Sequence, residues 1–95
     1  MPLKITKKAL EKIRDIMNTK KIPKNYGLRV GTQSAGCIGV SHMLGFDRMK
    51  KNDMVYERNG ISIYIEKKNV MYLVGLKLDY LEDEDTSGFS FLSEK

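Results

Sequence analysis

The sequence predicts an α+β domain in which strands dominate and a single longer helix precedes them. Three observations carry this prediction. Apolar residues between positions 7 and 18 recur at the spacing of one helix face. Residues 28–30, 40–46 and 61–65 alternate in side-chain character with the period of a strand, and an Asn59-Gly60 pair precedes the last of these alternations. We therefore expect mostly antiparallel or mixed sheets, with one short helix inserted among the later strands.

The length of the chain predicts one domain, residues 1–95, with a modest core. No run of about 18 apolar residues is present, so we expect no membrane-spanning helix. The first residues lack the apolar run of a secretory signal. The single cysteine cannot form a disulfide within the chain, which fits a reducing compartment. We therefore expect a cytoplasmic protein.

The first helix is expected over residues 7–18, with Thr6 as its N-cap. Its apolar side chains fall on one face: Ala9, Leu10, Ile13, Ile16 and Met17. Residues 1–30 carry nine basic side chains against two acidic ones. Such a charge could attract nucleic acid, but no aromatic residues are interleaved to stack on bases. We expect a solvated helix face and no nucleic-acid binding.

The pattern of residues 27–46 indicates a strand, a glycine-flanked loop and a second strand. The stretch contains five of the eight glycines, the only cysteine, Cys37, and the only histidine, His42. Gly36 and Gly39 flank Cys37 and shape its loop, since glycine permits positive φ and close approach of another group. We expect Cys37 to lie in an irregular loop at or near the surface. The alternative is a small buried hydrophobic thiol, which is the common state of a free cysteine.

The second half of the chain alternates between short strands and turns. We expect a charged turn over residues 47–52, a strand over residues 54–57 and a hairpin turn at Asn59-Gly60. The clearest strand follows, with Ile61, Ile63 and Ile65 facing the core and Ser62, Tyr64 and Glu66 facing the other way.

A short helix is expected over residues 70–74, capped by Asn69 and ended by Gly75. Leu76, Leu78 and Tyr80 predict a further strand, and residues 88–91 a last one with both phenylalanines on one face. Residues 82–85 form an acidic run without the spaced ligands and turn glycine of a calcium loop, so we expect a solvated loop there.

The order and spacing of these segments resemble the A-type iron–sulfur carriers, the HesB/IscA-like family. The resemblance covers nearly the whole chain and rests on these segments: Ile5-Thr6 with Ala9, Gly27-Leu28-Arg29-Val30, Gly36-Cys37-Ile38-Gly39, Leu44 with Phe46, Asp53 with Val55 and Glu57, Asn59-Gly60-Ile61, Tyr72-Leu73-Val74-Gly75, Leu78-Asp79-Tyr80, and Gly88-Phe89-Ser90-Phe91. It implies a compact β-rich HesB-like fold, a homodimer or higher homo-oligomer, and partners among iron–sulfur assembly or apo-client proteins.

The resemblance also implies a ligand set that this sequence carries only in part. In the family, a Cys-Gly-Cys tail follows the last strand, and its cysteines join the loop cysteine as ligands. Of these, only Cys37 carries over, while His42 stands where the family often has an aromatic residue and is itself a possible metal ligand. Along an unbroken strand these two side chains would face opposite ways, so ligation by both requires a sharp bend at Gly39. A packed, hydrogen-bonded histidine is the alternative.

The sequence thus predicts an iron–sulfur assembly protein, a carrier or accessory that holds iron or a labile cluster through Cys37 at a subunit interface. Two alternatives stay open. The domain could be a binding or regulatory module without metal, or Cys37 could act alone in thiol redox chemistry, although no resolving cysteine is present. No general acid and base are paired in a recognisable spacing, so we do not expect an enzyme.

Overall fold

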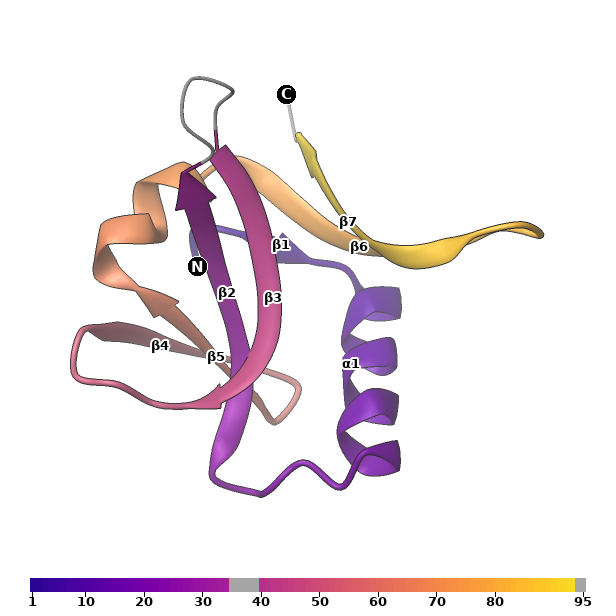
Figure 1. Cartoon of the computed structure of the whole chain (residues 1–95), viewed down its shortest axis with the longest axis horizontal. Coiled ribbons are helices and arrows are strands. Elements are labelled where there is room, and N and C mark those ends of the chain that lie inside the picture. The colour runs from indigo at the N-terminus through magenta and orange to yellow at the C-terminus, as the bar shows by residue number, and fades with distance from the viewer. Residues whose placement is uncertain (35–39, 94–95) are drawn as a thin grey trace.

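Two sheets and one long helix surround the core of the molecule (Figure 1). The computed structural model describes residues 1–34 and 40–93. The elements in chain order are β1 (Lys4–Ile5), α1 (Lys7–Thr19), β2 (Tyr26–Ser34), β3 (Val40–Arg48), β4 (Asp53–Arg58), β5 (Ile61–Glu66), the 3-10 helix η2 (Lys67–Tyr72), β6 (Leu76–Glu82) and β7 (Ser87–Ser93). The prediction of a strand-dominated α+β domain is confirmed.

The strands form a three-stranded sheet, β1-β6-β7, and a four-stranded sheet, β3-β2-β5-β4. The pairs β1/β6 and β2/β5 are parallel, and the remaining neighbours are antiparallel, so both sheets are mixed. The hairpin of β6 and β7 extends outward from the body beyond α1 (Figure 1). Sequence patterns did not indicate β1, because two residues are too short to show an alternation. None of the described helices is long and apolar enough to span a bilayer.

The N-terminal helix begins where the sequence predicts. The Thr6 hydroxyl accepts a hydrogen bond from the Ala9 backbone N–H at 3.1 Å, which satisfies one of the free donors of the first turn. The same hydroxyl donates to the Asp79 carboxylate of β6 at 2.7 Å and thereby joins the helix start to the three-stranded sheet. Ala9, Leu10 and Ile13 are buried, which confirms the predicted apolar face.

The β4–β5 hairpin confirms the predicted register. Asn59 and Gly60 both have positive φ, +50° and +81°, as a two-residue hairpin turn of type I′ requires. Ile61, Ile63 and Ile65 are buried in the core. Tyr64 faces the other side, as expected, yet it is only 7% exposed. Its burial was not predicted, because it depends on a neighbouring strand that the local pattern does not reveal.

The short inserted helix differs from its prediction. It is a 3-10 helix over Lys67–Tyr72, not a helix over residues 70–74, and Glu66 occupies its N-cap position without a side-chain hydrogen bond. Asn69 does not cap it, because its side-chain oxygen accepts a hydrogen bond from the Thr32 hydroxyl of β2 at 2.8 Å. This contact between distant segments ties η2 to β2. Gly75, with a φ of +81°, ends the turn that follows.

The hairpin of β6 and β7 matches the two predictions made for this part of the chain, a solvated acidic loop and a final strand. The acidic run lies at its exposed turn, where the Asp83 backbone N–H donates to the Thr86 carbonyl at 2.8 Å. Phe89 and Phe91 of β7 both pack against the core, as residues two apart on one strand face should. The predicted solvated loop and the predicted final strand are both confirmed.

The core lies between α1 and the inner faces of the two sheets. Its buried members are Leu3, Ala9, Leu10, Ile13, Leu28, Val30, Ile61, Ile63, Ile65, Leu73, Leu78 and Tyr80. The β2–β3 pair runs in register from Tyr26 opposite Arg48 to Ser34 opposite Val40. The strand β3 therefore extends through residues 47 and 48, where the sequence predicted the start of a charged turn.

Candidate functional site

Cys37, Gly36 and Gly39 lie outside the described residues, so their predicted arrangement stays a prediction. The structure describes the two ends of the connection that contains them. Residues 35–39 join Ser34 of β2 to Val40 of β3, and these two residues are directly opposite each other in the register. The cysteine is thus carried by the connection of the longest hairpin in the described fold.

His42 lies near the start of β3, opposite Thr32 of β2. Its ring stacks on the ring of Phe91 in β7, with the two centroids 4.8 Å apart and the planes at 25°. This contact joins the edge of the four-stranded sheet to the last strand of the other sheet. The imidazole is half-buried and packed, and metal ligation by His42 stays a prediction. Within the part of the chain that the structure describes, no three histidine, cysteine or carboxylate side chains lie close enough together to hold a metal ion.

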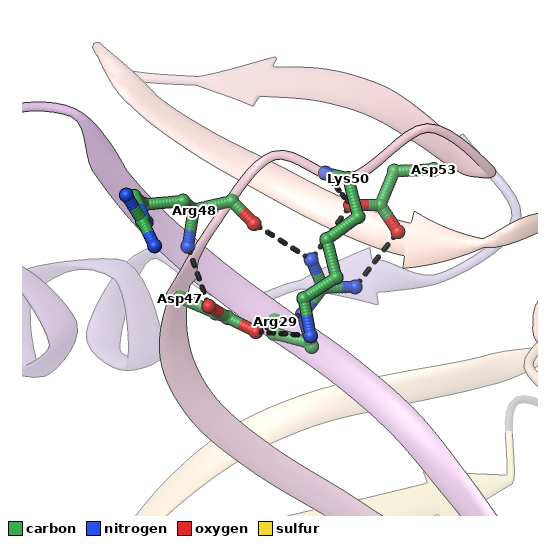
Figure 2. Close-up of polar contacts among 5 residues, drawn as sticks. All are labelled: Arg29, Asp47, Arg48, Lys50 and Asp53. Carbon is green, nitrogen blue, oxygen red and sulfur yellow. Dashed lines mark hydrogen bonds and ion pairs between the residues drawn. The ribbon is translucent and has the colours of Figure 1, made fainter.

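A charged cluster on the four-stranded sheet, at the end where β3 turns into β4, was not predicted from the sequence (Figure 2). The Arg29 guanidinium of β2 donates to both carboxylate oxygens of Asp53, at 2.7 and 2.6 Å, and to Asp47 at 3.0 Å. It also donates to the backbone carbonyl of Arg48 at 2.9 Å. The Lys50 backbone N–H donates to Asp53 at 2.7 Å, and the Lys50 ammonium lies 3.1 Å from Asp47. The cluster fixes the β3–β4 turn against β2.

The electrostatics of this cluster favour its charged state. The hydrogen bond from Arg29 holds the pKa of Asp53 below its usual value, and the Asp53 side chain is only 1% exposed. The hydrogen bond to Asp53 likewise raises the pKa of Arg29. For Asp47, the backbone N–H of Arg48 contributes most to lowering the pKa, ahead of Lys50. A bidentate arginine–carboxylate pair is geometrically specific, so this cluster serves to position the strand ends.

Tyr64 of β5 extends the cluster across the sheet. Its ring covers Gly27 of β2, where a methyl group would lie 2.8 Å from the ring and 2.6 Å from the Ser62 carbonyl oxygen. The Arg29 guanidinium carbon lies 5.9 Å from the centroid of the same ring, within the range of a cation–π contact. Gly27 is therefore required by packing within the chain. The sequence offered one signal for this cluster, an arginine at an outward strand position with aspartates on either side of a later turn.

A groove of about 320 Å³ lies over the β2–β3 pair, beside this cluster. The ion pair of Arg29 and Asp47 and the hydrogen-bonded pair of Thr32 and Asn69 are both part of its lining. By the strand register, Thr32 lies further from the β3–β4 turn than Arg29 does. The remaining lining residues are Gly31, Met43, Leu44, Gly45 and Phe46. The groove lies on the same hairpin that carries Cys37 in its connection, so one supersecondary unit supports both features.

The comparisons with known proteins agree with this architecture. The family model described as iron-sulphur cluster biosynthesis matches residues 1–94. The iron-binding protein IscA of Serratia proteamaculans is 33% identical over 92 residues, which cover 96% of this chain and 84% of that protein.

Two solved structures share the fold. The crystal structure of Escherichia coli SufA, involved in biosynthesis of iron-sulfur clusters, matches with a TM-score of 0.80 at 24% identity, over 98% of this chain and 81% of that one. The crystal structure of IscA with the 2Fe-2S cluster matches with a TM-score of 0.73 at 23% identity, over 96% and 81%. The family match over nearly the whole chain and the one-third identity to IscA show that this chain belongs to the iron–sulphur cluster biosynthesis family, the A-type carriers that its sequence resembles.

Proposed function

We propose that this iron–sulfur cluster assembly protein is a carrier that holds iron or a labile cluster through Cys37 at a contact between two chains. The observation that carries the proposal is the family match over residues 1–94, which includes the hairpin with the only cysteine of the sequence. Two relatives support the nature of the cargo, since one is named an iron-binding protein and another was solved with a 2Fe-2S cluster. The proposed role is transfer of cargo, not catalysis.

Ligand counting supports the contact between chains. Iron–sulfur clusters are commonly held by four protein ligands, mostly thiolates. These 95 residues supply one thiolate, so two chains related by a two-fold axis supply two, provided that the Cys37 loops face each other. The other ligands then come from outside thiols, which makes the site open to exchange. An exchangeable site suits a carrier that receives a cluster from an assembly protein and gives it to an apo-client in the cytoplasm.

Anaerobic reconstitution tests the proposal by measuring iron and acid-labile sulfide per chain. The expected result is at most about one cluster per two chains, with a dependence on added thiol, by the four-ligand count. Cys37→Ser should abolish cluster content without changing the far-ultraviolet circular dichroism spectrum. His42→Phe is the matched control, because it keeps an aromatic ring for the contact with Phe91 but removes both ring nitrogens. If His42→Phe keeps the native iron and sulfide content, His42 serves packing. If the variant loses its cluster, His42 is a ligand.

Two outcomes would contradict the proposal. Full cluster content in Cys37→Ser would exclude the thiolate as the ligand. Absence of iron under all conditions, with and without thiol, would favour the second hypothesis, a module that keeps the family fold and binds partners without metal.

A further inference from the structure

We propose that the groove over β2 and β3 is a docking site for an extended, uncharged segment of a partner polypeptide. The identity of that partner as an apo-client rests on the proposed function above, but the docking itself does not. The groove is formed by described residues, which include the ion pair of Arg29 and Asp47 and the hydrogen-bonded pair of Thr32 and Asn69.

The first evidence is a contrast between glycines in the β2–β3 pair. Gly27 is needed within the chain, because Tyr64 and the Ser62 carbonyl fill the space of a side chain. Gly31 and Gly45 line the groove, and a methyl group at either would meet nothing within 4 Å. Glycine inside a strand costs roughly 0.5–1 kcal/mol relative to alanine. Since no packing within the described chain requires these two glycines, we infer that an outside group approaches the backbone there.

The shape of the groove fits an extended chain. From Arg29 to Thr32 the strand rises about 10 Å, at roughly 3.3 Å per residue, which matches about three residues of a bound segment. Leu44 and Phe46 also line the groove while packing against the core, and they belong to β3, the outermost strand of its sheet. Met43 of β3, 50% exposed, adds an apolar side chain to the lining of the groove.

The charge balance of the groove selects an uncharged occupant. Two charged residues line it, Arg29 and Asp47, and they are paired with each other at 3.0 Å. Arg29 directs four of its five N–H groups at Asp47, Asp53 and the Arg48 carbonyl, as the donor count of a guanidinium shows. Asp47 is further neutralised by Lys50. A charged side chain would find both of the groove's charges already paired, whereas peptide groups can use the Thr32 hydroxyl and the Asn69 amide.

The test is a titration of the apo-protein, labelled with nitrogen-15, with the blocked tripeptides acetyl-Ala-Cys-Ala-amide and acetyl-Ala-Ser-Ala-amide. We expect millimolar binding of both, with amide shifts concentrated at residues 31, 43, 45 and 69. Gly31→Val and Gly45→Val should weaken binding at least tenfold, which corresponds to about 1.4 kcal/mol. The matched control is Gly88→Val in β7, another glycine with no atom within 4 Å of an added methyl group, which should bind like the native protein.

Each result separates the docking site from its alternatives. Valine favours strands, so Gly31→Val, Gly45→Val and Gly88→Val should each keep the native melting temperature or raise it. If a valine variant fails to fold, Gly31→Ala is measured in its place. Docking that persists in Cys37→Ser supports the groove even where cluster binding fails. The proposal is overturned when neither peptide shifts the groove amides, or when Gly88→Val weakens binding as much as Gly31→Val. It is also overturned when Gly31→Val dissociates a native oligomer in sedimentation equilibrium, because the groove is then an interface between copies.

Discussion

Asp53→Asn should destabilise this protein more than any other change of a single carboxylate that the structure describes. The substitution keeps the size of the side chain but replaces one acceptor oxygen with an amide group. That group would face donors from Arg29 and from the Lys50 backbone, which now donate to the two carboxylate oxygens at 2.6–2.7 Å. The Asp53 side chain is 1% exposed, so water cannot replace the lost acceptor.

The magnitude follows from the number and burial of the contacts. Breaking a buried ion pair by removing one partner costs about 3–5 kcal/mol. Arg29 keeps 21% exposure and retains Asp47, so we expect a smaller loss, about 2–3 kcal/mol of unfolding free energy, within the range for hydrogen bonds to charged groups. For a domain of this size, about 1 kcal/mol lowers the melting temperature by roughly 4–8 °C. The expected decrease is therefore about 10–20 °C by the same scaling.

Urea unfolding of a double-mutant cycle measures the effect. The cycle combines Asp53→Asn with Arg29→Met and yields the coupling energy between the two side chains. Glu57→Gln is the matched control, because Glu57 is an exposed carboxylate of the same strand, and its change should stay within about 0.5 kcal/mol. A coupling energy below about 0.5 kcal/mol, the value of an ordinary surface pair, would refute the reasoning.

Three further predictions concern the glycines, acid stability and the stacked rings. Gly27→Ala should lower the free energy of unfolding by about 1–3 kcal/mol, because the added methyl group would lie 2.6 Å from the Ser62 carbonyl oxygen. Gly31→Ala should not lower it, because no atom lies within 4 Å of a methyl group there, and equal effects of the two changes in urea unfolding would contradict this. The pKa values of Asp53 and Asp79 are lowered, chiefly by hydrogen bonds from Arg29 and Thr6, so their stabilisation is present above pH about 4 and is lost as the pH falls through the folded-state values. Asp53→Asn should therefore reduce the fall in melting temperature between neutral and acid pH. An unchanged fall would show that Asp53 does not contribute to the acid sensitivity. His42→Ala should cost about 0.5–1.5 kcal/mol more than His42→Phe, since only phenylalanine keeps the ring stack, and equal melting temperatures would show that the stack contributes nothing.

Local patterns determined those parts of the fold whose cause is local. The Thr6 cap, the apolar face of α1, the type I′ turn at Asn59-Gly60 and the buried isoleucines of β5 all follow from spacing and turn chemistry within a few residues. Their energetics need only neighbours in sequence and one apolar side, so periodicity and turn residues were enough to predict them. The order of such segments was also enough to identify the family.

Contacts between distant segments decided the positions where those patterns failed. Asn69 has the residue type of a helix cap, but its hydrogen bond to Thr32, 37 positions away, gives it another partner, and η2 begins earlier. The alternation of β5 makes Tyr64 an outward side chain, yet Tyr64 is buried because β2 brings Gly27 beneath its ring.

The charged cluster and the groove beside it were decided by tertiary structure alone. Arg29, Asp47 and Asp53 are ordinary charges in the sequence, and they meet only because β3 and β5 flank β2 and the β3–β4 turn folds back onto it. The same pairing places Gly31 and Gly45 in one groove, although 14 positions separate them in the chain. The sequence by itself therefore determined the helix, the hairpin turn, the buried strand faces and the family. The tertiary structure decided which distant side chains share a site, because strand pairing depends on closing long loops and on packing the whole sheet, and neither leaves a signal within a short stretch of residues.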